Sequence, residues 1–139
     1  MLLKVKKLNP EAVLPSYAHK GDAGLDLFSC ENCILQPGER KMISTGIALE
    51  FPEGYVALIW DKSGVAASGI KSMGGVIEHT YRGEYKVIMF NTSKDNYSIK
   101  KGDKIAQLLI QPIVTAEVEE VSELSETERG SGAFGSTGI

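Results

Sequence analysis

Short apolar stretches separated by turn residues run along most of the chain. Stretches rich in Val, Ile, Leu, Phe and Tyr cover residues 24–29, 39–51, 54–60, 84–91 and 103–114. Turn signals built from Pro, Gly, Asn and Asp occur at residues 36–39, 52–54, 94–96 and 101–103. Many short strands with a turn about every 8–12 residues predict an all-β sandwich or jelly-roll-like barrel and disfavour a parallel α/β fold. Residues 65–68 predict one short helical turn.

From Thr115 onward the composition changes. Residues 115–130 carry six glutamates between Glu117 and Glu128, and their alternation predicts that the segment begins as a strand. The residues that follow are mostly Gly, Ser and Thr, too small and polar to bury themselves, and they predict a mobile tail. We therefore expect a β core over residues 1–122 and a flexible C-terminal arm over residues 123–139.

The overall composition is that of an ordinary globular domain. A chain of 139 residues, 42% hydrophobic and 24% charged, is long enough for one domain with a sizeable core. Its net charge of −3 gives no reason to expect nucleic acid or an anionic membrane as a partner. The N-terminal apolar stretch is too short for a secretory signal, and no apolar run reaches the ~20 residues of a membrane span. These features predict a cytoplasmic protein.

The two cysteines, Cys30 and Cys33, are three positions apart. A structural zinc site needs four ligands, and the histidines available to complete one, His19 and His79, are far away in sequence. A thioredoxin-like redox pair would need a βαβ context, which the flanking residues do not supply. We expect both cysteines to be reduced thiols in or beside a strand.

Three segments contain residues suited to nucleotide chemistry. The tail combines Arg129 and Phe134 with hydroxyl groups between glycines, which suits a lid that stacks on a base and donates to phosphates, although a linker or frayed end has the same composition. Residues 61–64 predict a strand-to-helix turn whose backbone N–H groups can hold phosphate, or an ordinary turn. Residues 72–83 place Glu78 and Tyr81 after two glycines, so that a carboxylate beside a phosphate site would orient water, although a solvated Glu and a strand Tyr in an ordinary hairpin fit the same segment.

Together these segments resemble the trimeric deoxyuridine triphosphatases. Five family motifs occur in order and span nearly the whole chain, at residues 23–27, 61–64, 75–83, 102–107 and 129–138. The resemblance implies a distorted β jelly-roll barrel that forms a homotrimer, with three active sites at subunit interfaces, each closed by a C-terminal arm. It implies hydrolysis of dUTP to dUMP and pyrophosphate, with Mg²⁺ held by the triphosphate and not directly by protein ligands.

The resemblance also assigns roles to individual residues. Glu78 would orient the attacking water, and Asp26 would stand near the metal and its waters. Tyr81 would lie beneath the deoxyribose and exclude a 2′-hydroxyl. Uracil would be read in a slot too tight for a 5-methyl group by Ser72, Gly75, Val76 and Ile77. Phosphate contacts are implied for Lys62, Ser63, Gly64 and Gln107, and a further substrate contact for Lys86. In the arm, Phe134 beside Gly135 would cover the base, and the γ-phosphate would meet Arg129, Ser136 and Thr137.

The chain departs from the family pattern at two positions and leaves two alternatives open. Lys62 replaces an arginine, which keeps the charge but loses the planar fork. Glu78 replaces the aspartate that positions the water, so a catalytically weakened or silent dUTP-binding trimer is one alternative. The related dCTP deaminases are the other. They carry a catalytic Glu three residues before the Asn that ends the strand after the third motif, and in this chain that position is Ile88.

Overall fold

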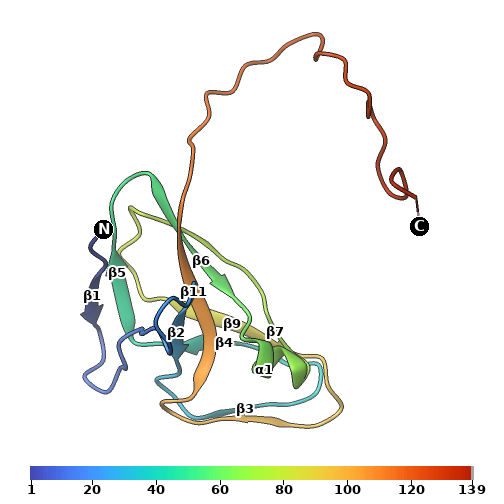
Figure 1. The fold of residues 1–139 in the computed structure, drawn as a ribbon. Coiled ribbons are helices and arrows are strands. Elements are labelled where there is room, and N and C mark those ends of the chain that lie inside the picture. Colours follow the sequence, from blue (N-terminus) through green and yellow to red (C-terminus); the bar gives the residue numbers. More distant parts are fainter. Residues whose placement is uncertain (139) are drawn as a thin grey trace.

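Antiparallel pairing of short strands builds the body of the chain, as seen in a computed structural model that describes residues 1–138 (Figure 1). The elements in chain order are β1 (Lys4–Lys7), β2 (Leu25–Phe28), β3 (Cys33–Leu35), β4 (Arg40–Ser44), β5 (Ile47–Glu50), β6 (Tyr55–Trp60), α1 (Ser63–Ala67), β7 (Ile70–Ser72), β8 (Val76–Glu78), β9 (Lys86–Asn91), β10 (Tyr97–Ile99) and β11 (Lys104–Pro112). The predicted all-β class, the short helical turn and the main strands are confirmed.

Four sheets share one hydrophobic core. Their strand orders are β2-β11-β6-β8, β4-β9-β7, β1-β5 and β10-β3, and every pairing is antiparallel. Inward-facing residues of the two larger sheets, such as Leu27, Ile59 and Leu108 from one and Ile43 and Met89 from the other, belong to a single buried cluster. This arrangement is the jelly-roll barrel expected from the sequence, with β8 as an edge strand of the four-stranded sheet.

The stretch at residues 39–51 is divided into β4 and β5. The break falls at Thr45 and Gly46, where the chain bonds to the segment before β9 and not to a neighbouring strand. The Thr45 hydroxyl donates to the carbonyl oxygen of Tyr85, and the Gly46 N–H donates to Oε1 of Glu84 at 3.1 Å. These bonds tie the β4–β5 corner to the residues that later form one wall of the candidate site.

The prediction that residues 115–130 begin as a strand is wrong. β11 ends at Pro112, and the side chains from Gln111 to Gly138 are exposed, with Val118 93% exposed. A strand needs a neighbour to satisfy its backbone groups, and in this chain no strand of residues 1–138 pairs with the segment. In Figure 1 it leaves the body after β11 and curves outward to the C-terminal end.

Other sequence expectations concern single features. Cys33 begins β3 and Cys30 lies shortly after β2, and both are free thiols, as expected. The division at residues 122 and 123 stays a prediction, and Ile139, the last residue of the predicted arm, lies outside the described residues. Within residues 1–138, no helix has the length and apolar character required to cross a membrane.

Candidate active site

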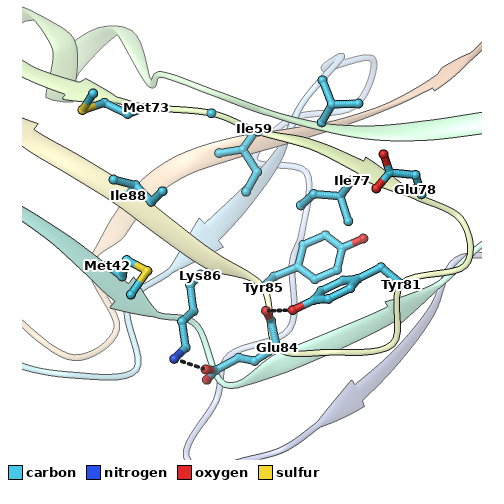
Figure 2. A pocket seen from close by; sticks show the side chains of 13 residues that line it. Met42, Ile59, Met73, Ile77, Glu78, Tyr81, Glu84, Tyr85, Lys86 and Ile88 are labelled. Atoms are coloured by element: carbon cyan, nitrogen blue, oxygen red, sulfur yellow. Dashed lines mark hydrogen bonds and ion pairs between the residues drawn. The ribbon is translucent and has the colours of Figure 1, made fainter.

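A cavity of about 610 Å³ opens between β8 and the start of β9 (Figure 2). This volume is ordinary for a small-molecule site, which typically measures roughly 300–1,000 Å³. The wall is mostly apolar with a few polar groups, and it brings together residues of β4, β6, β8, β9 and the connecting turns. The lining residues are Met42, Ile59, Met73, Gly74, Gly75, Val76, Ile77, Glu78, Tyr81, Glu84, Tyr85, Lys86 and Ile88.

Tyr81 stands at the mouth of the cavity in a fixed position. Its hydroxyl donates to the carbonyl oxygen of Glu84 at 3.0 Å, and its ring lies 6.0 Å from that of Tyr85, centroid to centroid, with the planes tilted by 46°. Gly83 permits this placement, because a Cβ added there would lie 2.3 Å from the Tyr81 hydroxyl oxygen. The main-chain acceptor and the missing side chain therefore hold the ring where the cavity opens.

Glu78 ends β8 on the same side of the cavity as Tyr81 (Figure 2). Its side chain is exposed, and within residues 1–138 it makes no hydrogen bond or ion pair. In the register it lies opposite Val56 of β6. An unpaired carboxylate at the mouth of a cavity can orient water for attack on a bound phosphate.

Lys86 forms the lower rim of the cavity in the view of Figure 2. Its Nζ lies 3.7 Å from Oε2 of Glu84, and Oε1 of Glu84 accepts hydrogen bonds from Ser44 and from the Gly46 N–H. Glu84 thus links the rim lysine to the β4–β5 corner. Because Lys86 is exposed, its ammonium group remains accessible to an anionic ligand.

A second cluster surrounds Asp26 of β2. Asp26 is 3% exposed, Lys62 pairs with its Oδ1, and the Nζ of Lys104 lies 2.9 Å from its Oδ2. Burial alone would raise the pKa of Asp26, but hydrogen bonds and charge from Lys104 and Lys62 outweigh burial and hold the pKa below its ordinary value. Asp26 therefore stays ionised and keeps both ammonium groups beside it.

Gln107 connects this cluster to the turn before α1. On β11 it lies opposite Asp26 on one side and Trp60 on the other, and its Nε2 donates to the carbonyl oxygen of Asp61 at 2.8 Å. Gly24 packs directly on it, since a Cβ at Gly24 would lie 2.3 Å from Oε1 of Gln107. The cluster around Asp26 and the turn at residues 61–64 thus form one surface.

Ser63 and Gly64 begin α1 and are exposed at that surface. The carboxylate of Asp61 accepts from the Ser72 N–H at 2.6 Å and pairs with the Nζ of Lys71 at 2.5 Å. Burial opposes ionisation of Asp61, but these partners outweigh it and lower its pKa. Asp61 therefore fixes the turn that presents Ser63, Gly64 and Lys62.

Ser72, which the resemblance assigns to uracil, is buried in this chain. It is 6% exposed at the end of β7, its amide is engaged by Asp61, and it is not part of the cavity wall. The expected uracil contact by Ser72 stays a prediction. The backbone at Gly75, Val76 and Ile77, by contrast, lines the cavity along the outer edge of β8.

The predicted site residues fall into three separate groups. Glu78 and the Asp26 cluster are separated along β6, because Glu78 lies opposite Val56 while Gln107 lies opposite Trp60, about 13 Å further along the strand. The arm forms the third group. Phe134 is fully exposed, Arg129 donates through Nε to the Gly132 carbonyl oxygen at 3.0 Å, and their neighbours Gly135, Ser136 and Thr137 are also exposed. One chain does not bring the three groups together.

Sequence reasoning missed several residues of the cavity wall. Met42 of β4, Ile59 of β6 and Met73 just after β7 belong to none of the five motifs, and the fold brings them to the cavity wall. Tyr85 and Glu84 follow the third motif directly and could have been found by that position. Across residues 1–138, no group of three or more His, Cys, Asp or Glu side chains is placed to hold a metal ion.

The chain is similar to known proteins along its whole length. The family model described as dUTPase matches residues 10–138. The deoxyuridine 5′-triphosphate nucleotidohydrolase of Nautilia profundicola is 52% identical over 141 residues, covering 99% of each chain, and that of Clostridioides difficile is 48% identical over 140 residues, covering 99% of this chain and 98% of the relative. A solved dUTPase of Staphylococcus bacteriophage 80alpha with dUpNHpp has a TM-score of 0.94 at 35% identity, covering 99% of both chains.

Proposed function

The chain belongs to the dUTPase family, and we propose that it hydrolyses dUTP to dUMP and pyrophosphate. The observation that carries the proposal is the shared cavity of Glu78, Tyr81 and the outer edge of β8. The cavity contains a carboxylate, an aromatic ring that can pack against a sugar, and a strand edge whose backbone can hydrogen-bond to a base. These are the parts that selective hydrolysis of a deoxyuridine nucleotide requires.

The free edge of β8 would recognise uracil. β8 pairs with β6 on one side, and in residues 1–138 its other edge has no strand partner. The Gly75 carbonyl accepts from the Ile59 N–H at 3.2 Å, and alternate residues of an antiparallel strand face opposite edges, so Val76 directs its N–H and C=O groups toward a base. Gly75 and Ile77 would line the slot on either side of it. Hydrogen bonds to fixed backbone groups discriminate bases more strongly than apolar contact does. Tyr81 would pack under the deoxyribose, where a 2′-hydroxyl would meet its ring.

The phosphates would be held by the surface around Asp26. Lys62 supplies positive charge, Ser63 and Gly64 supply exposed backbone and hydroxyl donors, and Gln107 supports the turn from β11. Lys86 would add a contact from the rim of the cavity. From the arm, we propose that Phe134 covers the base beside Gly135, and that Arg129, Ser136 and Thr137 reach the γ-phosphate.

We also propose that Mg²⁺ arrives with the triphosphate. The described residues offer no cluster of ligands that would hold the ion alone, and both oxygens of Asp26 already face ammonium groups. Asp26 would therefore meet the ion through water. When bound, Mg²⁺ would neutralise charge on the phosphates.

Glu78 would perform the proton transfer. Formation of dUMP and pyrophosphate breaks the bond between the α-phosphorus and the oxygen that bridges to the β-phosphate. Water attacks the α-phosphorus, the Glu78 carboxylate takes its proton, and pyrophosphate leaves. The side chain is exposed and free of other partners, so it is available for this role.

A homotrimer would complete the site. The three groups of site residues are separated within one chain, and the arm extends away from the body with Phe134 fully exposed. In a cyclic trimer, each site could take the cavity from one copy, the phosphate surface from a second and the arm from the third. A cytoplasmic location remains a prediction.

Hydrolysis of dUTP by the full chain tests the proposed function. Pyrophosphate release, coupled to a pyrophosphatase, should be fast with dUTP and much slower with dTTP, dCTP and UTP. Glu78→Gln should abolish release while calorimetry still detects dUTP binding, because the base and phosphate contacts come from other residues. Binding without hydrolysis by the unsubstituted chain would identify a silent dUTP-binding protein instead, and formation of dUTP and ammonia from dCTP would identify a deaminase.

A further inference from the structure

Tyr85 forms the floor of the cavity and is held there by its main chain. It is 1% exposed, its N–H donates to the Ile47 carbonyl oxygen at 2.9 Å, and its own carbonyl accepts from the Thr45 hydroxyl. The ring also packs against Tyr81. The position of the ring is therefore set by backbone bonds and packing, without any help from the Tyr85 hydroxyl.

That hydroxyl has no partner. It is buried, and within residues 1–138 it makes no hydrogen bond. The other buried side-chain oxygen in this condition, Oδ2 of Asp26, at least has the Lys104 ammonium 2.9 Å away. A buried, unpaired hydroxyl is destabilising, and phenylalanine would fill the same space without that cost. The hydroxyl therefore has no use in the packing of the free chain, which points to a partner in the ligand-bound site.

Glu78 is a carboxylate on the wall of the same cavity, and within residues 1–138 it has no ion-pair partner. Figure 2 shows the hydroxyl end of Tyr85 directed toward the side of the cavity where Glu78 lies. Burial is the largest cause that raises the pKa of Tyr85 to about 12, with smaller contributions in the same direction from Tyr81 and Glu78 and an opposing one from Arg82. The phenol is thus a protonated donor at neutral pH. Glu84 and Lys86, the other charged groups on this wall, pair with each other.

We propose that Tyr85 is a positioning residue, whose hydroxyl donates a hydrogen bond to the Glu78 carboxylate in the substrate-bound site. The proposal rests on the proposed hydrolysis and deepens it. A glutamate is about 1.5 Å longer than an aspartate, so its carboxylate needs an additional contact to stay where it orients the water. Tyr85 supplies that contact from a rigid floor. An aspartate at position 78 would be too short to use it in the same way.

A double-mutant cycle on the full chain tests this role. Tyr85→Phe is made in the natural background and in Glu78→Asp, and single-turnover hydrolysis of dUTP is measured from pH 5 to 9 with saturating Mg²⁺. With Glu78 present, Tyr85→Phe should lower the rate about tenfold and leave dUTP affinity within about twofold. The acidic limb of its pH profile should move to higher pH, because Glu78 loses a donor that favours its ionised form. With Asp at position 78, the rate should change less than about twofold.

Tyr97→Phe is the matched control, because Tyr97 lies on β10 outside the cavity wall, and it should leave the rate and the profile unchanged. The Tyr85→Phe variant keeps the ring, and its thermal midpoint should not fall below that of the natural chain. Equal rate losses in both backgrounds, no loss with Glu78 present, or an unshifted acidic limb would overturn the role of Tyr85 alone. Absence of dUTP hydrolysis by the natural chain would instead refute the proposed function, and the positioning role with it.

Discussion

Replacing Gly83 with alanine should displace Tyr81 without disturbing the fold. Gly83 does not have a positive φ, so the backbone accepts an L side chain there. The added Cβ would lie 2.3 Å from the Tyr81 hydroxyl oxygen and 2.5 Å from its Cζ, whereas ordinary contacts begin at 3.4 Å. The ring must therefore move by about 1 Å, and the 3.0 Å hydrogen bond to the Glu84 carbonyl is lost.

A shift of this size in a ring that supports the deoxyribose should be costly for catalysis. A misplacement of ~1 Å in an active site can lower the rate on the order of 10²-fold, and we expect a loss of that order in kcat/KM for dUTP. We also expect the preference for dUTP over UTP to fall by about tenfold, because the displaced ring no longer blocks a 2′-hydroxyl.

The assay is coupled pyrophosphate release with dUTP and with UTP, accompanied by thermal melts. Tyr81→Phe is the companion variant, because it removes the hydrogen bond to Glu84 but leaves the ring in place. It should lose less than about tenfold in kcat/KM and keep the sugar preference. If Gly83→Ala melts normally and retains both the natural kcat/KM and the natural dUTP preference, the assignment of Tyr81 to the sugar is wrong.

Three further predictions concern the phosphate surface and the arm. Gly24→Ala should push Gln107 away from the Asp61 carbonyl and lower kcat/KM for dUTP about tenfold, with smaller effects on the thermal melt. Asp26→Asn should destabilise the chain by about 1–3 kcal/mol in urea melts at pH 7. Folding lowers the pKa of Asp26 below its ordinary value of 3.8, so the stability that the ionised side chain contributes is fully present above pH 3.8. That stability is lost as the pH falls through the lower pKa of the folded chain. The free energy of unfolding of the Asp26→Asn variant should therefore depend less on pH in this range. A chain lacking residues 129–139 should stay folded but inactive. If the cavity and the arm of each site come from different copies of a trimer, refolding this chain together with Glu78→Gln chains should restore activity at about a quarter of the sites. A mixture that stays inactive would contradict that sharing.

Much of the fold could be predicted because it rests on local signals. Apolar stretches and turn residues located the main strands, and the small polar residues at the C-terminal end predicted a segment that does not bury itself in the core. The strand expected at residues 115–130 failed for a physical reason. Alternation of side chains describes a strand, but a strand forms only where another backbone accepts its hydrogen bonds, and none of residues 1–138 does so there.

The site was only partly predictable, because a sequence motif identifies residues but does not say which side chains contact them in the folded chain. Sequence indicated Asp26 and Lys62 as separate contacts for metal and phosphate, while the fold makes them ion-pair partners. Sequence placed Ser72 with uracil, while the fold engages its amide with Asp61 and leaves it outside the cavity.

By itself, the amino-acid sequence determined the all-β class, the short helical turn, the exposed arm and the order of five motifs, since each depends on residues close together along the chain. Tertiary structure decided which motif residues share a cavity, that two lysines hold a buried aspartate ionised, and that the buried Tyr85 hydroxyl has no hydrogen-bond partner within residues 1–138. Those features depend on contacts between strands far apart in sequence, and the pairing and register of those strands set which side chains meet.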